Sequence, residues 1–562
     1  MKTKTYDTEL CVIGGGMAGL CCAIAAARRG VKTVIIQDRA VFGGNASEEI
    51  RMWICGAHGN DNRETGIIEE IFLENFYYNK NLKYPLWSGV LYGKAMAEEN
   101  LTVLLNSSCL DATTENGEIK SVKAWQSNAE TYHIVNAKYF ADCSGDSVLS
   151  TLTGANYFYG REAKKDYNET IPPDVADKKT MGMSCIFQIR EREEKVPFIA
   201  PPFAYKYETD ADLPFKDHYI GSNFWWIEVG GEWDCIHDTD RCREECLKIC
   251  YGVWDHMKNR GDHKADNWEM EWIGFLPGKR ESRRYKGKYV VTQNDVEAGG
   301  RFEDVIAYAG WSMDDHFPQG FYYTAGHPSI YHKAPSPWGI PYRAIISDNV
   351  KNLGFAGRNI SVTHAALSSS RVMATCAILG QALGTAVSLA VKSDTPLDKI
   401  NVKELQHALL EDDCYIPYVK REAPALTKKA VCNAEIVRNG EERKEENLWI
   451  GKKGDYIEYE WETEEEIKEI RLVFDSDMNR DYDNMPCYYP LKETKFRLPE
   501  TLVKDYVIEG EKENGEKVKL EVKDNYLRFV RHKVDWKVKK IRLTPLATFG
   551  AESMRVFDFE VK

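Results

Sequence analysis

The strongest constraint on this chain is a glycine-rich turn between a short apolar strand and an Ala-rich helix. Residues 8–13 have the composition of a buried strand, and Gly-Gly-Gly-Met-Ala-Gly follows at 14–19. Residues 20–29 have helical composition, and residues 31–36 form a second apolar run. A strand, a glycine turn, a helix and a strand within about 30 residues are typical of a dinucleotide-binding unit. The pattern predicts an α/β domain with a parallel sheet.

Each glycine of this turn has a separate expected role. We expect Gly14 to make the tight turn, Gly16 to let the backbone approach a pyrophosphate, and Gly19 to let the helix pack closely on the strand. The free N–H groups at the start of the helix, including those of Met17 and Ala18, would face the phosphates.

The end of the second strand departs from the usual pattern of such units. The position that normally holds a ribose-binding acid is Gln37, with Asp38 and Arg39 next in the chain. The Gln37 amide oxygen can still accept a hydrogen bond from a ribose hydroxyl, and Asp38 can share that role. All three residues are predicted cofactor contacts.

Composition excludes several other classes of protein. The chain has 562 residues, 74 Lys and Arg against 87 Asp and Glu, and a net charge of −13. This acidic balance argues against nucleic acid as a partner and against an anionic membrane surface. The length allows several domains.

Targeting and metal binding are not predicted either. An apolar run at 11–27 is similar to a secretory signal, but its glycine pattern and the acids at Asp7 and Glu9 oppose that interpretation. No other run reaches membrane-spanning length, so we expect a cytoplasmic protein without a membrane span. Fifteen scattered cysteines fit a reducing compartment. Cys242, Cys246 and Cys250 share one helix face and are expected to be buried thiols, with no metal site.

Residues 8–38 resemble the N-terminal FAD-binding region of glutathione-reductase-type flavoproteins. The segment 42–52, Phe-Gly-Gly-Asn-Ala-Ser-Glu-Glu-Ile-Arg-Met, narrows the resemblance to the FAD-dependent oxidoreductase family, distantly similar to succinate dehydrogenase and fumarate reductase flavoproteins. The resemblance covers most of the chain up to about residue 398, with gaps in the middle. It implies FAD as the cofactor, held without a covalent bond, because the spacing around His58 does not match the attachment motif.

The resemblance also implies further FAD contacts. The segment 139–146 is similar to the second FAD motif, and 352–358 to the C-terminal one, which leads into a helix expected at 368–392 with a Ser-rich start. The implied contacts are Gly43, Gly44, Asn45, Ser47, Cys109, Asp142, Gly145, Asp146, Gly357, Arg358 and Ser369.

A catalytic site is expected between this domain and an aromatic insertion at 156–325, which the resemblance implies is a substrate-holding cap. His364 precedes the predicted helix and is our candidate base, with His327 and His316 as weaker candidates. Arg343 and Arg283 are candidates for positioning the substrate. For the cap aromatics, stacking on a sugar ring and packing in the cap's own core stay open.

The C-terminal part changes in character. Short alternating strands from about residue 426 predict an all-β sandwich that resembles galactose-binding-like jelly rolls. Its role is either glycan binding, or packing and homo-oligomerisation. The predicted layout is a discontinuous Rossmann-like FAD-binding α/β domain at 1–155 and 326–400, an α+β cap at 156–325, a linker at 401–425 and the sandwich at 426–562.

Three functions follow from these predictions. The first is FAD-dependent oxidation of a small polar substrate, with a sugar or glycoside as one candidate, by hydride transfer to flavin N5. The second is reduction of an activated C=C bond, and the third is carbohydrate binding without catalysis. No second nucleotide fingerprint is present in the sequence, so the electron acceptor is unassigned.

Overall fold

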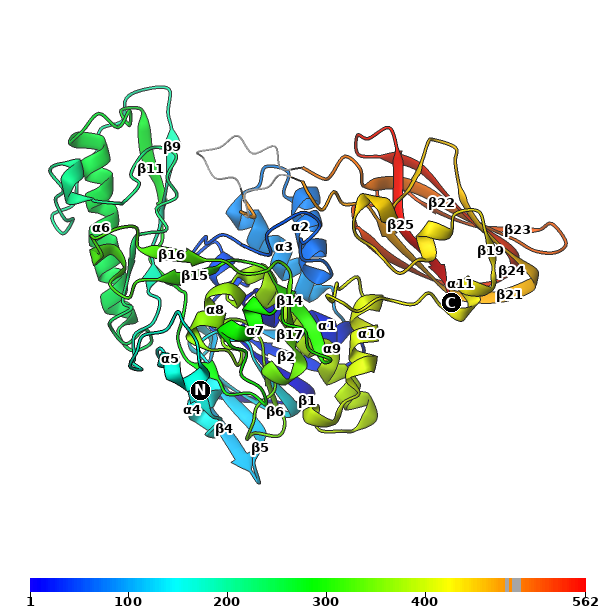
Figure 1. Cartoon of the computed structure of the whole chain (residues 1–562), viewed down its shortest axis with the longest axis horizontal. Helices are drawn as coiled ribbons and strands as arrows, with labels where there is room; N and C mark the ends of the chain where they lie inside the picture. The colour runs from blue at the N-terminus through cyan, green and yellow to red at the C-terminus, as the bar shows by residue number, and fades with distance from the viewer. Residues whose placement is uncertain (481–484, 488–496) are drawn as a thin grey trace. The chain divides into compact units, whose positions relative to one another are not determined.

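The structure is a computed structural model of the chain (Figure 1), and it describes residues 1–480, 485–487 and 497–562. The described residues divide into two compact units. The first comprises Met1–His58, Asn81–Leu405 and 485–487, and the second comprises Gly59–Lys80, 406–480 and 497–562. The segment Gly59–Lys80 therefore belongs with the C-terminal residues, which departs from the domain predicted at 1–155.

The first unit is built on a seven-stranded sheet. Its order is β3-β2-β1-β6-β5-β4, and a seventh strand, β18, pairs with β6. The parallel part consists of β1 (Lys2–Ile13), β2 (Thr33–Ile36), β3 (Leu101–Leu104), β6 (Thr131–Asp142) and β18 (Leu353–Phe355). The antiparallel strands β4 (Ser107–Glu115) and β5 (Glu118–Gln126) extend it next to β6. The predicted parallel α/β sheet is confirmed.

Two helices pack against each other beside this sheet. Helix α1 (Met17–Arg28) is contacted by α9 (Met373–Ser393). A Cβ on Gly380 would lie 2.0 Å from the Ala18 carbonyl oxygen, and one on Gly384 would lie 2.2 Å from the Cys22 carbonyl oxygen. Because any larger side chain would collide with α1 at these two positions, Gly380 and Gly384 allow α1 and α9 to pack closely.

The prediction of a single helix at 368–392 is wrong at its N-terminal end. The segment forms two helices, α8 (His364–Ser370) and α9, with a break at Arg371 and Val372. Thr363 caps α8 by accepting a hydrogen bond from the Ala366 N–H, and Ser368–Ser370 lie in its last turn. The serines therefore do not cap the longer helix.

The inserted region carries the 21-residue helix α6 (Thr239–Asn259) beside the short strands β8 (Met183–Ser184), β9 (Phe187–Glu191) and β11 (Trp268–Ile273) (Figure 1). Cys242, Cys246 and Cys250 are buried on α6 and are free thiols, as expected. Most of the region's tryptophans pack in this core.

The second unit contains a seven-stranded antiparallel sheet. Its order is β20-β25-β21-β24-β22-β23, with β19 paired to β21. The strands are β19 (Val431–Cys432), β20 (Trp449–Gly451), β21 (Ile457–Phe474), β22 (Val503–Glu511), β23 (Lys517–Val522), β24 (Phe529–Thr548) and β25 (Met554–Val561). The expectation of short strands does not hold for β21 and β24, which have 18 and 20 residues and pair with each other in irregular register.

Helix α2 (Ile67–Tyr78) also belongs to the second unit. The buried Glu69 on α2 receives two hydrogen bonds of 2.8 Å from the Arg480 guanidinium, beyond the end of β21. This buried bidentate pair joins the segment to the C-terminal sheet.

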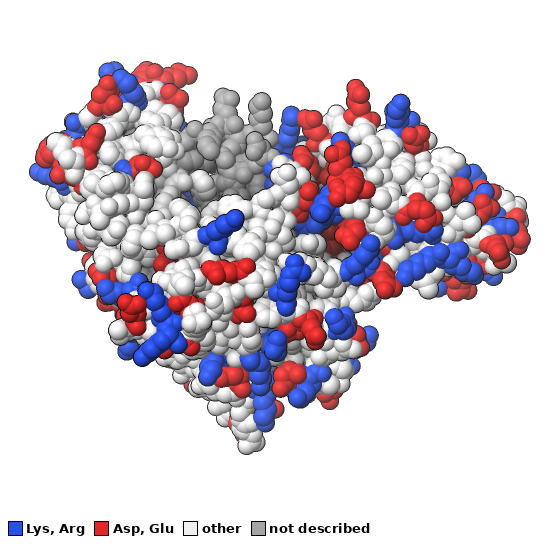
Figure 2. All heavy atoms as spheres, viewed as in Figure 1, with Lys and Arg blue, Asp and Glu red and all other residues white. Residues whose placement is uncertain are grey.

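Within the described part of the chain, one helix, α9, has the length and composition of a membrane span, which the sequence analysis did not predict. Of its apolar window 89% is buried inside the protein, as in a core helix. On the face shown in Figure 2, basic and acidic side chains are interspersed, the pattern of a solvated surface and not of a phosphate-binding track.

Candidate functional site

The glycine turn lies where β1 ends and α1 begins. Gly14 has φ +97°, and a Cβ there would lie 2.6 Å from the Cys143 carbonyl group. A Cβ on Gly19 would lie 1.8 Å from the Gly14 carbonyl oxygen. Both positions therefore require glycine, for the turn and for the close contact of helix and strand.

The start of α1 is open to an anion. Gly16 is the N-cap and, as a glycine, offers no capping side chain, and the first turn of the helix holds no acid. The N–H groups of that turn are therefore available to a phosphate. The backbones of Gly16 and Gly43 pair in a parallel bridge, which places the segment 42–45 against the turn.

Gln37 has a different role from the predicted one. Its side chain is buried, its Oε1 accepts a hydrogen bond of 2.7 Å from the Gly15 N–H, and its Nε2 donates to the Val41 carbonyl oxygen. Gln37 thus ties the glycine turn to the end of β2, and its amide oxygen is already used. The neighbouring Asp38 has an exposed carboxylate, 3.8 Å from Nε of Arg39, whose oxygens can accept a hydrogen bond from a ribose hydroxyl.

A cavity of about 640 Å³ runs past these elements. Fifteen predicted cofactor contacts line it: Gly14, Gly16, Met17, Ala18, Gln37, Asp38, Arg39, Gly43, Gly44, Asn45, Cys109, Gly145, Asp146, Gly357 and Arg358. Segments from the whole length of the first unit therefore line the cavity.

Four predicted contacts lie behind the lining. Gly19 packs against Gly14, and Ser47 is fully buried. Asp142 accepts hydrogen bonds from the Leu149 N–H and the Tyr285 hydroxyl, at 2.8 and 2.6 Å. Ser369 donates to the Trp311 carbonyl oxygen and accepts from the Trp338 indole. These residues support the site from behind.

Asp146 is the centre of an ion-pair network on the cavity wall. Its carboxylate is 2.7 Å from Nη2 of Arg358 and 2.8 Å from Nζ of Lys279, and it accepts a hydrogen bond from Ser282. Burial raises the pKa of Asp146, but the two cations outweigh it and hold that pKa below its usual value. Arg358 also donates to the Gly145 carbonyl oxygen. The network joins the second and third FAD-like motifs.

A second charged cluster lines the cavity where the inserted region covers it. Nδ1 of His316 lies 2.6 Å from Oε2 of Glu228, and Nε2 lies 3.3 Å from Oδ2 of Asp314. Arg371 donates to Asp314 at 3.0 Å, and Nη1 of Arg280 lies 3.3 Å from Glu228. All except Glu228 line the cavity, together with Trp225, Trp311 and Tyr331.

The charges of this cluster are set by its own members. Burial lowers the pKa of His316, but Glu228 and Asp314 outweigh it and raise that pKa. Burial raises the pKa of Glu228, but Arg280 and His316 lower it to about 2. Within the described residues, Oδ1 of Asp314 and Nε of Arg371 are buried without a hydrogen-bond partner.

His364 is placed differently from the prediction. It is buried outside the cavity lining, with Nδ1 3.0 Å from Glu281 and Nε2 3.0 Å from Asp315. Burial lowers the pKa of His364, but the two carboxylates raise it to about 10. His364 is therefore cationic and lies off the cavity lining, so it is not placed to take a proton from a substrate in the cavity.

The other predicted catalytic residues also lie off the cavity lining. Arg343 pairs with Asp304 at 2.9 Å in a separate hollow. His327 is exposed. Arg283 lies over the Tyr157 ring, and the arginine of its segment that lines the cavity is Arg280.

Strand alternation explains why Asp314 and His316 were not both predicted to line the cavity. On β15 (Met313–His316), Asp314 and His316 line the cavity, while Asp315 bonds His364. A polar i, i+2 pair on a strand is the signal that could have found them. His316 entered the prediction only as a weaker candidate.

Comparison with known proteins identifies the family. Residues 9–409 match the family described as FAD dependent oxidoreductase, and the chain belongs to it. Its cofactor is FAD, and it is an oxidoreductase of this family. A search of curated proteins finds no match.

Solved structures show weak likenesses. A geranylgeranyl bacteriochlorophyll reductase-like protein from Thermoplasma acidophilum is 11% identical, with 73% of this chain and 86% of that chain covered and a TM-score of 0.33. E. coli quinol fumarate reductase FrdA is 10% identical, with 70% and 72% covered and a TM-score of 0.28. A family 32 carbohydrate-binding module from Streptococcus pneumoniae EndoD is 12% identical, with 23% and 84% covered and a TM-score of 0.18.

The residues present fit FAD. The start of α1 and the Gly16–Gly43 bridge form a backbone cradle that suits a pyrophosphate, and Asp38 lines the same cavity. Met373 and Cys376 bring the start of α9 to the same cavity, and the N-cap of that helix is Val372, which has no polar side chain to cap it. Its partial positive charge suits an electron-rich ring system.

Proposed function

We propose that the protein oxidises a small, hydroxyl-bearing polar substrate, with a sugar or glycoside as the favoured class. The observation that carries the proposal is one cavity that contains both the dinucleotide cradle and the Arg280–Asp314–His316–Arg371 cluster. Trp225, Trp311 and Tyr331 lie beside the charged groups and offer flat apolar surfaces. A sugar ring presents the matching combination of polar edges and apolar faces.

Different side chains of the cluster have different roles at the substrate. When bound, FAD supplies the acceptor for a hydride from the substrate C–H. The His316–Asp314 pair takes the hydroxyl proton, with Glu228 holding His316 at Nδ1. Arg371 and Arg280 orient substrate oxygens, because their guanidinium groups donate in fixed directions. The cap residues Trp225 and Ile186 exclude water.

The same cluster supports a second candidate function. Arg280, Arg371 and a protonated His316 form a cationic group that suits a carboxylate next to an activated C=C bond. In that direction, His316 donates its proton to the substrate. The two functions require opposite protonation states of His316.

Anaerobic spectroscopy of the purified yellow protein tests the proposal. We expect a member of a panel of sugars and polyols to bleach the flavin absorbance. Failure of the whole panel, together with reoxidation of the dithionite-reduced protein by an enoate, would establish the reductase function instead. A protein that retains no FAD would contradict both.

Two histidine variants locate the site. In His316→Gln, we expect flavin reduction to slow by about 10²–10⁴-fold, the usual contribution of a general base. In His327→Gln, which removes an exposed imidazole away from the cavity, the rate should be unchanged. Equal rates for the two variants would place the chemistry elsewhere.

A further inference from the structure

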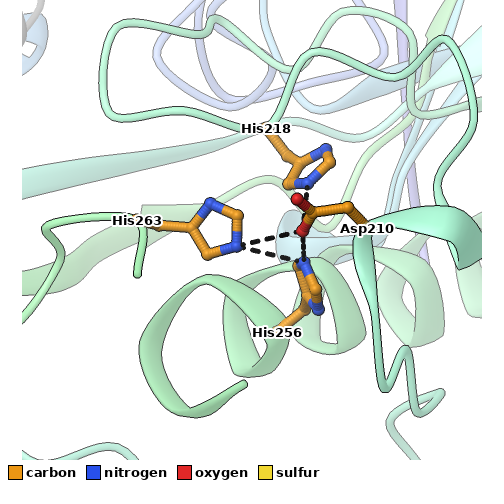
Figure 3. A group of neighbouring side chains, drawn as sticks. All are labelled: Asp210, His218, His256 and His263. Atoms are coloured by element: carbon orange, nitrogen blue, oxygen red, sulfur yellow. Dashed lines mark hydrogen bonds and ion pairs between the residues drawn. The ribbon is translucent and has the colours of Figure 1, made fainter. Parts of the chain in front are cut away.

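Three histidines and one aspartate meet at the end of α6, in the inserted region (Figure 3). Asp210 begins a short 3-10 helix, His218 follows in the next loop, His256 is in the last turn of α6, and His263 lies just beyond that helix. One ligand atom from each residue lies within 4.8 Å of all the others. Three separate stretches of chain thus converge on one point.

Four of the six distances between these atoms are close to those of a coordination shell. Oδ1 of Asp210 is 3.0 Å from Nε2 of His256, 3.4 Å from Nε2 of His218 and 3.5 Å from Nε2 of His263. The Nε2 atoms of His256 and His263 are 3.1 Å apart. Four ligands at about 2.0–2.1 Å from a tetrahedral Zn²⁺ lie about 3.3 Å from one another.

Hydrogen bonds on the far side of two rings fix which nitrogen faces the centre. Nδ1 of His256 lies 2.9 Å from the Tyr207 carbonyl oxygen, and Nδ1 of His218 bonds the Lys216 carbonyl oxygen. A carbonyl only accepts, so each Nδ1 carries the hydrogen and each neutral ring turns the lone pair of Nε2 to the centre. Backbone carbonyls commonly orient metal-binding histidines in this way.

Without a bound cation, lone pairs on these ligand atoms face one another and repel. Nε2 of His256 faces both the Asp210 carboxylate and Nε2 of His263 at about hydrogen-bond distance. A single divalent ion satisfies all four atoms at once.

We propose that Asp210, His218, His256 and His263 bind one divalent transition-metal ion, with Zn²⁺ as the best match. Three imidazole nitrogens and one carboxylate oxygen suit Zn²⁺ better than Ca²⁺ or Mg²⁺, which prefer oxygen ligands. The proposal changes the expectation from sequence that the chain holds no metal. The ligand spacing in sequence matches no familiar zinc motif, because the four residues come from three segments.

The four protein ligands close the shell, so the ion would be structural. It would fasten the loop at 210–218 to α6. That loop is bonded to the cavity wall, because the Trp226 indole donates to the Asp217 carbonyl oxygen and the Trp225 side chain lines the cavity. The metal would therefore stabilise the region that covers the cofactor.

Metal content and stability of the full-length flavoprotein test the proposal. After treatment with a chelator and its removal, titration with Zn²⁺ should show one bound ion per chain and raise the melting temperature. Substitution by Co²⁺ should produce the visible absorption of a tetrahedral cobalt site. A stoichiometry near zero, or a melting temperature that responds to pH but not to Zn²⁺, would overturn the proposal.

Single substitutions give the matched comparison. His263→Ala and Asp210→Asn remove ligands from loops and should weaken Zn²⁺ binding at least about tenfold. His237→Ala removes an exposed histidine that pairs with Asp234 in the same region, and should bind Zn²⁺ as the wild type does. Circular dichroism of each metal-free variant separates loss of the site from loss of folding. Equal Zn²⁺ affinity in all three variants would contradict the assignment.

Discussion

Nδ1 of His316 lies 2.6 Å from Oε2 of Glu228, a carboxylate that is fully buried. The carboxylate fixes the hydrogen of His316 on Nδ1 in the neutral ring and stabilises the charged ring when Nε2 is also protonated. Glu228 therefore controls both the orientation of the imidazole and its charge. Nε2 is the atom whose protonation changes, and it faces Asp314 and Arg371 on the cavity side.

The pH dependence of flavin reduction follows from this pair. Because the pKa of His316 is raised, the neutral ring that can take a proton appears only above the usual histidine range near pH 6.5. We expect the anaerobic rate of substrate oxidation to rise with pH through an apparent pKa above that value. Stopped-flow absorbance measures it. For C=C reduction, which needs the charged ring, the rate would fall over the same range.

Glu228→Gln provides the control for this assignment. Loss of the carboxylate removes a group that raises the pKa of His316, so the pH profile should move to lower pH. The neighbouring Arg280 keeps its hydrogen bonds to Ser184 and the Trp225 carbonyl oxygen in this variant. An unchanged profile would show that His316 is not the titrating group.

Gly19→Ala should abolish FAD retention. The added Cβ would lie 1.8 Å from the Gly14 carbonyl oxygen, so α1 must move away from the glycine turn and its N–H groups from the phosphates. Gly89→Ala in α3 (Tyr84–Met96) is the matched control, because a Cβ there meets nothing within 4 Å. The ratio of flavin to protein absorbance after gel filtration measures both. Full retention in Gly19→Ala would contradict the packing role.

The glycine turn was predictable because its geometry is local. The positions of Gly14, Gly16 and Gly19 follow from spacing within one strand–turn–helix unit, and the structure confirms that unit. Gln37 was not predictable in the same way. Its amide bonds the Gly15 N–H across the turn, and only the folded contact shows that its acceptor is already occupied.

The residues on the substrate side of the cavity could not be predicted, because tertiary contacts that the sequence does not show decide their positions. Asp314, Asp315 and His316 are three consecutive polar residues, a pattern that suits a loop as well as a strand. Their pairing with β16 (Ser329–His332) makes them alternate, so that two face the cavity and one faces His364. Arg371 lies at a helix break that neither glycine nor proline marks. Tertiary packing decides both features.

Arg358→Met should weaken FAD binding. The guanidinium bonds Asp146 and the Gly145 carbonyl oxygen on the cavity wall, so its loss leaves a buried carboxylate with one cation fewer. We expect at least about a tenfold loss of FAD affinity, equivalent to about 1.4 kcal/mol, because the carboxylate that loses its partner changes the charge and shape of the cavity wall. Arg343→Met removes an arginine paired with Asp304 away from this cavity and should leave affinity unchanged. Fluorescence titration of the apoprotein with FAD compares the two.

His364→Gln should destabilise the fold in a pH-dependent manner. The pKa of His364 is raised to about 10, above its value near 6.5 in the unfolded chain, so its contribution is complete below pH 6.5 and is lost as the pH rises through about 10. At pH 6 the variant should lose roughly 3–5 kcal/mol, the cost of breaking a buried ion pair, and the difference from wild type should narrow toward pH 10. Urea unfolding at several pH values measures this difference, with His327→Gln as the exposed control. A loss independent of pH would mean that His364 is neutral in the folded protein.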